Sequence, residues 1–407
     1  MSNTVATAGN KGSKVRSDCF VTLALKDSGG IQVSLQSKVK ALYESAIMKL
    51  CVEVLHFYNI EHAEVTLEDS GALPLVQAAR LEAAVQEVKK VDAPYLLPFL
   101  EANDYPATKE QHRFSRLYLP GNTPSMMLNA GIHQPHGIIL DLEDSVAFDK
   151  KEEARIMVRN ALRGINFYGA ERMVRINQFP KGLEDLPYII PHKVHTLLVP
   201  KCEGADQIHQ LEEHIEQIKK KQDSTDEIFL MPIIESAMGV EKAFEIATAS
   251  PRVVALAIGL EDYTADLGTR RTQDAWESFY ARTRIVNACK AAKIQAIDSV
   301  YSDVGNMEGL RATVATSKSL GFEGMGCIHP RQIQVIHDCY APTSEEIAYA
   351  KKVVNAFMVA KEKGLGVVSL GTKMIDPPVV KRADQILTLA LAMELVEQNW
   401  REEFIDD

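Results

Sequence analysis

The chain has 407 residues, of which 46% are hydrophobic, so it can bury the cores of two domains or of one large domain with an addition. Its formal net charge is -10 and its pI is near 5.7, which excludes a general affinity for nucleic acid or anionic membranes, because both need clustered Lys and Arg. There is no signal-peptide core and no run of roughly 18 apolar residues, and the six cysteines are scattered, so we expect a cytoplasmic protein with reduced thiols.

The first 95 residues predict a small α+β domain. Two runs that alternate between apolar and polar residues, at 19–25 and 31–35, flank a turn at DSGG, and such alternation is typical of half-buried strands. A helix, a third strand and a second helix follow at 37–58, 63–69 and 74–90. Residues 96–112 contain prolines and mixed charges, which are typical of a linker.

Beyond residue 113 the pattern changes to short apolar runs, each followed by a turn and an amphipathic helix. Near-continuous apolar strands that alternate with helices imply a parallel sheet buried on both faces, and eight of them favour a (β/α)8 TIM barrel over 113–343. An open doubly wound sheet is the alternative, but no G-x-G-x-x-G turn supports it. The eight runs lie at 116–121, 136–145, 171–177, 195–201, 228–236, 253–262, 295–303 and 321–330.

The last segment, 344–407, predicts two long helices at 344–363 and 377–403. Between them lies the glycine-rich, partly extended sequence GLGVVSLGTKMIDPP. We expect this segment to form a helical lid or a swapped arm that serves oligomerisation, and not a ninth barrel strand.

Charged and polar residues follow seven of the eight predicted strands. Active sites of (β/α)8 barrels lie at the carboxyl ends of the strands, so these residues are the candidates for catalysis. Several carboxylates on one rim favour a hard divalent cation with oxygen ligands. The candidates are Asp141, Glu143, Asp144, Arg175, Lys201, Glu235, Glu261, Asp262, Asp298, Tyr301, Asp303 and His329.

Glu235 and Asp262, which end neighbouring strands, suit Mg²⁺, because this cation takes only one or two protein carboxylates. The guanidinium of Arg175 offers a planar fork for a substrate carboxylate. Other roles stay open for three residues: Asp144 could cap the following helix, His329 could be structural, and Lys201 could form a Schiff base in a metal-free aldolase.

Nine segments between residues 113 and 383 resemble, in order, the β-subunits of citrate lyase within the HpcH/HpaI aldolase and citrate lyase family. They are RLYLPGNTPSMM, GIILDLEDSVAFDKKEEAR, MVRIN, LLVPKCEGADQI, PIIESAMGV, AIGLEDYTADLG, QAIDSVYSD, GCIHPRQI and GLGVVSLGTKMIDPPVVKRA. The resemblance implies a Mg²⁺-dependent barrel enzyme that cleaves a carbon–carbon bond.

The resemblance also assigns roles to single residues. It implies that Glu235 and Asp262 bind the metal and that Arg175 holds the keto-acid fragment. Asp376 matches a catalytic aspartate that related enzymes lend to a neighbouring subunit, which implies a homo-oligomer, a trimer or a hexamer. Arg113 resembles a basic residue near the phosphates of the thioester. Further candidates are Glu143 for catalysis, and Lys201 and His329 for binding substrate or CoA.

The N-terminal domain resembles the acyl carrier γ-subunit of citrate lyase over residues 12–85. In that family a serine two residues before the aspartate of an SD pair carries the prosthetic arm. Arg16 stands at this place here, next to Ser17. We therefore favour loss of the arm, with modification of Ser17 as the alternative.

The favoured activity is cleavage of a citryl thioester to oxaloacetate and an acetyl thioester. The substrate would be a CoA or acyl-carrier thioester of a hydroxy di- or tricarboxylic acid. Cleavage of (S)-citramalyl-CoA or malyl-CoA is the alternative. A non-catalytic scaffold that recruits a CoA-transferase α-subunit is a third reading.

Overall fold

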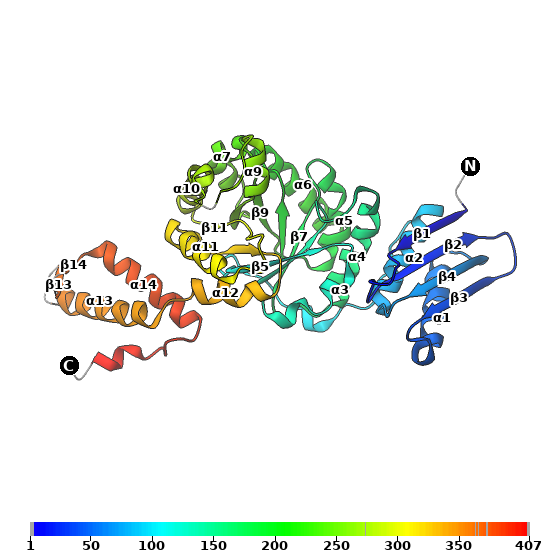
Figure 1. Ribbon diagram of the computed structural model, residues 1–407, viewed down its shortest axis with the longest axis horizontal. Helices are drawn as coiled ribbons and strands as arrows, with labels where there is room; N and C mark the ends of the chain where they lie inside the picture. The colour runs from blue at the N-terminus through cyan, green and yellow to red at the C-terminus, as the bar shows by residue number, and fades with distance from the viewer. Residues whose placement is uncertain (1–3, 273, 363, 365, 372, 405–407) are drawn as a thin grey trace. The chain divides into compact units, whose positions relative to one another are not determined.

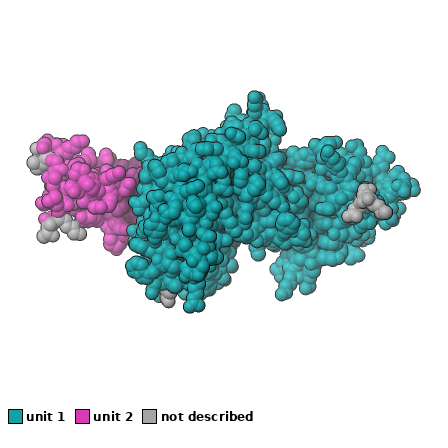
Figure 2. Space-filling view, turned by 90° about the horizontal axis from the view of Figure 1, so that it is seen from above, with its two compact units in different colours: residues 1–333 teal, residues 334–407 magenta. Residues whose placement is uncertain are grey.

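The computed structural model describes residues 4–272, 274–362, 364, 366–371 and 373–404. It forms two compact units, residues 1–333 and 334–407, which Figure 2 shows in different colours. The division falls within helix α12 (Arg331–Tyr340), whereas the sequence places the end of the barrel domain after residue 343. Among the described residues, no helix has both the length and the apolar composition that crossing a bilayer requires.

The first unit begins with a four-stranded sheet in the order β1-β2-β4-β3 (Figure 1). Strands β3 and β4 are parallel, and the other two pairings are antiparallel. The strands predicted from alternation are present, whereas β1 was not predicted. The elements are β1 (Val5–Gly9), β2 (Cys19–Leu25), β3 (Ile31–Ser37), α1 (Lys40–Phe57), β4 (Ala63–Asp69) and α2 (Pro74–Val88).

Helix α2 lies between this sheet and helix α4 (Lys151–Gly164) of the barrel. Two buried ion pairs of opposite sense join the helices. The guanidinium of Arg80 on α2 binds Glu153 at 2.8 Å, while Glu82 on α2 accepts two hydrogen bonds from Arg159, each of 2.7 Å. Because exchanging the two contacts would place like charges together, the pairs fix one orientation of the domain on the barrel.

Eight parallel strands form the barrel, in the order β11-β10-β9-β8-β7-β6-β5-β12. A bridge between Asp298 and Met325 joins the two ends of this sheet. The structure thus confirms the predicted (β/α)8 architecture. The strands are β5 (Ser115–Pro120), β6 (Gly137–Asp141), β7 (Glu171–Arg175), β8 (Thr196–Val199), β9 (Phe229–Ile234), β10 (Ala255–Ile258), β11 (Gln295–Ile297) and β12 (Met325–Cys327).

Helices follow the barrel strands and cover the outside of the sheet (Figure 1). The longer helices after α4 are α6 (Ala205–Lys221), α10 (Trp276–Ala292) and α11 (Met307–Leu320). The shorter helices are α3 (Pro124–Met127), α5 (Leu186–Ile189), α7 (Ala237–Glu241), α8 (Ala243–Ala247) and α9 (Leu260–Asp266).

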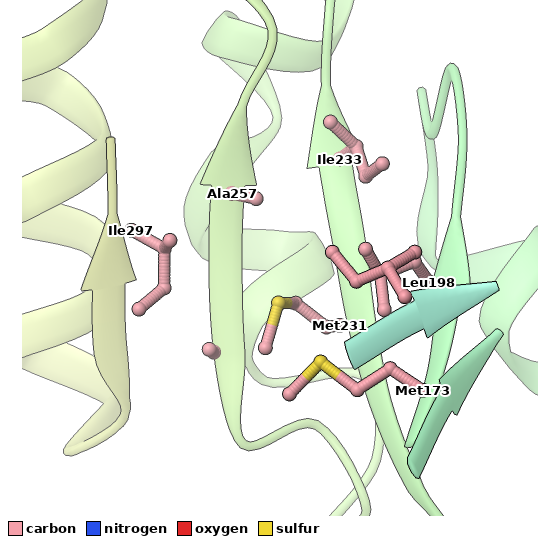
Figure 3. Close-up of a cluster of buried hydrophobic side chains, with 8 residues drawn as sticks. Met173, Leu198, Met231, Ile233, Ala257 and Ile297 are labelled. Carbon is pink, nitrogen blue, oxygen red and sulfur yellow. The ribbon is translucent and has the colours of Figure 1, made fainter. Parts of the chain in front are cut away.

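The interior of the barrel is packed with apolar side chains from successive strands. Figure 3 shows Met173 of β7, Leu198 of β8, Met231 and Ile233 of β9, Ala257 of β10 and Ile297 of β11 pointing into one cluster. The side chain of Tyr118 on β5 packs against this cluster. The interior is therefore a core, which supports a rigid rim at the carboxyl ends of the strands.

The second unit contains a helical hairpin of α13 (Ser344–Glu362) and α14 (Pro377–Ala392). The extended segment between the helices forms an antiparallel ribbon of β13 (Val368–Leu370) and β14 (Lys373–Ile375). Helix α14 is shorter than the predicted 377–403, and soon after its end Glu394 has a left-handed φ of 55°. Apolar residues of both helices, including Val353 and Leu387, form the core of this unit.

Candidate active site

A cavity of about 740 Å³ opens at the carboxyl ends of the barrel strands. Of the twelve candidates that end the predicted strands, eight line this cavity: Asp141, Asp144, Arg175, Glu235, Glu261, Asp262, Asp298 and His329. The walls deeper in the barrel are mostly apolar, and Ile233 and Ala257 are among the lining residues. Arg116 and Tyr118 also line this part of the cavity.

Glu235 follows β9 and is buried, with 6% of its surface exposed. One carboxylate oxygen accepts a hydrogen bond of 2.9 Å from the backbone N–H of Lys201. Gly259 provides the space for the other oxygen, since a Cβ at this position would lie 2.4 Å from Oε1. Burial, with a contribution from the charge of Asp262, raises the pKa of Glu235 to about 7.

Asp262 lies in the first turn of α9 and also lines the cavity. Its carboxylate pairs with the ammonium group of Lys201 at 3.3 Å. Lys201 therefore contacts both predicted metal ligands, one through its backbone and one through its side chain. This shared contact places the two carboxylates at one part of the rim.

The carboxylates at this rim suit Mg²⁺, which takes few protein ligands, better than a metal that takes all its ligands from the protein. Within the described part of the chain, no three or more His, Cys, Asp or Glu side chains are grouped closely enough to hold a metal ion. Mg²⁺ needs only one or two carboxylates, because water and substrate oxygens complete its octahedron. Glu235 and Asp262 supply such hard oxygen ligands, and a cation would neutralise the buried charge of Glu235.

Arg175, the last residue of β7, lines the cavity and is held by two carboxylates. Its Nε–H and Nη2–H donate to the two oxygens of Asp141 at 2.7 Å each, and its Nη1 lies 2.9 Å from Glu143. The ion pair between Arg175 and Asp141 leaves further N–H groups on Nη1 and Nη2 of Arg175, so the guanidinium keeps donors for a ligand.

Asp141 and Glu143 thus act on Arg175 in the structure. Burial opposes ionisation of Asp141, but the hydrogen bonds and charge of Arg175 hold the pKa of this carboxyl below its usual value. Glu143 is buried and does not line the cavity; Gln178 donates to it at 2.8 Å, and burial raises the pKa of Glu143. The sequence names Glu143 as a catalytic candidate, and in the structure both Glu143 and Asp141 contact Arg175.

Lys201 has a left-handed φ of 48° and a partly exposed side chain. Burial alone would lower the pKa of Lys201, but the adjacent Asp262 carboxylate raises it above the ordinary value. A Schiff base requires a neutral amine, so this environment argues against the alternative of a metal-free aldolase.

Two other residues with an alternative structural role line the cavity. Asp144 is exposed at the rim and does not cap α4, because the N-cap position of that helix is Lys150. His329 lines the cavity, and its Nδ1 accepts a hydrogen bond of 3.2 Å from the backbone N–H of Arg331 at the start of α12.

Arg113 lies away from the cavity, before the first residue of β5, and is fully buried. It forms two hydrogen bonds with Glu171, of 2.7 and 3.0 Å, and its other N–H groups bind the side chain of Gln295 and backbone carbonyls. This arrangement contradicts the expectation that Arg113 binds thioester phosphates, because no donor remains and the residue is at the amino ends of the strands.

Two further candidates lie in other parts of the chain. Asp376 belongs to the second unit, where its carboxylate caps α14 by accepting a hydrogen bond of 3.2 Å from the N–H of Val379. Ser17 has a left-handed φ of 53°, and its neighbour Asp18 is buried and binds Arg80 through both carboxylate oxygens, at 3.0 and 2.9 Å. The loop that would carry an arm is therefore anchored beside the barrel.

A family model described as HpcH/HpaI aldolase/citrate lyase matches residues 115–330, more than half of the chain. The chain belongs to this family. It is 38% identical over 291 residues to the citrate lyase subunit beta of Leuconostoc mesenteroides subsp. cremoris, which covers 71% of this chain and 96% of the relative. It is 31% identical over 337 residues to the mitochondrial citramalyl-CoA lyase of Homo sapiens, with 79% and 99% covered.

A solved structure shares the fold of this chain. The CitE protein of Mycobacterium tuberculosis, in complex with magnesium, acetoacetate and coenzyme A, superposes with a TM-score of 0.58 at 28% identity, covering 70% of this chain and 99% of that one. A second family model, described as malonate decarboxylase delta subunit, matches residues 3–88. Both resemblances expected from the sequence, the lyase barrel and the carrier-like N-terminal domain, are thus confirmed.

Proposed function

We propose that this protein is a Mg²⁺-dependent carbon–carbon lyase that cleaves a 3-hydroxyacyl thioester, with citryl thioester as the favoured substrate. The observation that carries the proposal is the convergence of Glu235, Asp262 and Arg175 on one cavity at the barrel rim. The names of the relatives support the reaction class, since they include a citrate lyase subunit and a citramalyl-CoA lyase.

Glu235 and Asp262 would hold the metal. Bound Mg²⁺ supplies Lewis-acid stabilisation to negative charge on the carboxylate and hydroxyl oxygens of the substrate. Arg175 binds the carboxylate on the carbinol carbon with the N–H groups that Asp141 leaves free. Because Asp141 fixes the guanidinium before the substrate arrives, little orientational freedom is lost on binding.

Cleavage transfers the hydroxyl proton to a base and converts the carbinol carbon to the keto group of oxaloacetate. The electron pair of the broken carbon–carbon bond remains on the acetyl thioester as an enolate. Protonation of the enolate carbon then completes the reaction, and we assign this step to Asp376 of a second copy of the chain. Because Asp376 would come from a second copy of the chain, the proposal also includes a homo-oligomer, either a trimer or a hexamer.

The N-terminal domain supports free CoA thioesters as substrates. A carrier domain must move its arm between sites, whereas Arg80 and Glu82 fix this domain to helix α4 through buried ion pairs. Arg16 also stands where the carrier family has its modified serine. We therefore propose that Ser17 carries no arm and that the protein acts in the cytoplasm without a CoA-transferase α-subunit. These features also favour (S)-citramalyl-CoA as the second candidate substrate.

The test is an assay of purified protein with Mg²⁺ against citryl-CoA, (S)-citramalyl-CoA and malyl-CoA, each with and without EDTA. We expect oxaloacetate from citryl-CoA, with loss of activity in EDTA. If pyruvate from citramalyl-CoA is the main product, (S)-citramalyl-CoA, the second candidate, is the substrate. No product from any of the three would refute the lyase proposal and support the scaffold reading.

Variants and mass spectrometry separate the parts of the proposal. Glu235→Ala and Asp262→Ala should abolish Mg²⁺-dependent turnover, while Glu241→Gln, a change of an exposed acid on α7, should leave it intact. An intact mass equal to that of the polypeptide confirms that Ser17 carries no arm, and added mass at this residue contradicts it.

A further inference from the structure

Arg116 is a buried cation on the wall of the proposed active site. It lies on β5 with 1% of its surface exposed and lines the same cavity as Glu235 and Asp262. Its Nη1–H donates to the sulfur of Met231 at 3.0 Å, and its Nε has no hydrogen-bond partner in the described part of the chain. A thioether is a weak acceptor, so the guanidinium is poorly satisfied.

Most other buried arginines of this unit are bound differently. Arg172 also has no carboxylate partner among the described residues, but it donates to the backbone oxygen of Lys193 at 2.8 Å, contacts His195 at 2.7 Å and does not line this cavity. Arg80, Arg113 and Arg159 are each fully or almost fully buried, and each pairs with a carboxylate at 2.9 Å or less. No carboxylate of the described residues lies within ion-pair distance of Arg116. A buried charge without a counter-charge is costly, and such a group at a ligand cavity indicates an anion that arrives from outside.

Tyr118 connects Arg116 to the rest of the site. The two residues are on the same face of β5, and both line the cavity. Burial raises the pKa of Tyr118, while the charges of Arg116 and Arg175 lower it, so the Tyr118 hydroxyl lies within electrostatic range of both guanidinium groups. Gly326 leaves space beside Tyr118, because a Cβ there would come within 3.1 Å of the ring.

We propose that Arg116 binds the terminal carboxylate of a carboxymethyl group on the carbinol carbon of the substrate, and thereby selects tricarboxylic 3-hydroxyacyl thioesters. Arg175 binds one carboxylate at the rim, and Arg116 binds the second one deeper in the barrel. A methyl group or a hydrogen at the same carbon leaves Arg116 buried and unpaired, which disfavours citramalyl and malyl thioesters. This inference rests on the proposed function and specifies its substrate.

The experiment compares citryl-CoA with (S)-citramalyl-CoA in the wild type and in Arg116→Met, which has a similar length and no charge. We expect Arg116→Met to lower kcat/KM for citryl-CoA by roughly 100-fold, because a charge-assisted contact is lost. For citramalyl-CoA, kcat/KM should change by less than about threefold, since no partner of Arg116 is removed. Arg116→Lys, which keeps the charge, should retain part of the preference for citryl-CoA.

A binding measurement keeps this inference separate from the lyase proposal. Calorimetry in the presence of Mg²⁺ gives the affinities of oxaloacetate and pyruvate, which differ by the second carboxylate. Arg116→Met should weaken oxaloacetate binding and leave pyruvate binding unchanged, even if the wild type cleaves neither thioester. Equal losses for both ligands would show that Arg116 only supports the barrel core, and a wild type that prefers citramalyl-CoA would also overturn the inference. Arg116→Gln provides the same comparison if the methionine variant does not fold.

Discussion

The substitution Gly259→Ala tests whether the position of the Glu235 carboxylate determines metal binding. Gly259 has φ of -107° and ψ of 97°, so alanine is allowed there without backbone strain. The new Cβ would lie 2.4 Å from Oε1 and 2.7 Å from Cγ of Glu235, whereas ordinary contacts begin at 3.4 Å. The carboxylate must therefore move by about 1 Å, and a misplacement of this size can cost roughly 100-fold in rate.

Two measurements check this expectation. Titration calorimetry without substrate should show weaker Mg²⁺ binding, and kcat/KM for citryl-CoA should fall by roughly 100-fold. Gly305→Ala is the matched control, because its Cβ would meet only Asp303 Oδ1, at 3.4 Å. If Gly259→Ala binds Mg²⁺ within about threefold of the wild type, the oxygens of Glu235 at this position do not ligate the metal.

Three further changes test other contacts. Glu82→Gln should lower the free energy of unfolding, measured by urea denaturation, by about 3–5 kcal/mol, because Arg159 is left buried without its carboxylate. Adding Arg159→Met to the same chain should recover much of this loss. If the losses of the two single variants simply add in the double variant, the two residues are not a coupled pair. Asp141→Asn should lower kcat/KM by roughly 10- to 100-fold through misplacement of Arg175, and an unchanged rate would exclude this positioning role. Burial, with smaller effects of nearby cations, lowers the pKa of His195 to about 3, below the unfolded value of about 6.5. Folding thus favours the neutral form of His195, so the contribution of this residue to stability should be full above pH ~6.5 and should fall as the pH decreases toward the folded pKa. The melting temperature of His195→Gln should therefore depend less on pH over this range than that of the wild type. An equal dependence would show that His195 is not the group responsible.

The barrel could be predicted because its strands are short apolar runs with polar residues at their carboxyl ends. The parallel register places Asp141 opposite Arg175 on neighbouring strands, so the proximity of these two candidates follows from the fold. Strand β1 was missed because VATAG has small residues and no strong alternation, and its pairing with β2 depends on tertiary contacts.

The roles of single arginines were harder to predict, because burial and partners are not visible in the sequence. Arg113 is a basic residue before a strand, yet Glu171, 58 positions later, binds its side chain. Arg116 stands within an apolar run, and the pattern does not mark it as a site residue, although it lines the cavity. The space that Gly259 provides for Glu235 also required the structure, since the two residues follow different strands.

Helix α2 is buried on all sides, with a continuous run of buried residues from Leu75 to Val85. A helix at the surface of an independent domain would keep one polar face in water. Here Glu82 on that face pairs with Arg159 of helix α4, and Arg80 binds both Asp18 of its own domain and Glu153 of α4. A fragment that ends before the barrel would therefore leave Glu82 without its cation and Arg80 with Asp18 alone, and a barrel fragment would expose Glu153 and Arg159. The N-terminal domain is thus no interchangeable module, and deleting it removes part of the barrel's own support.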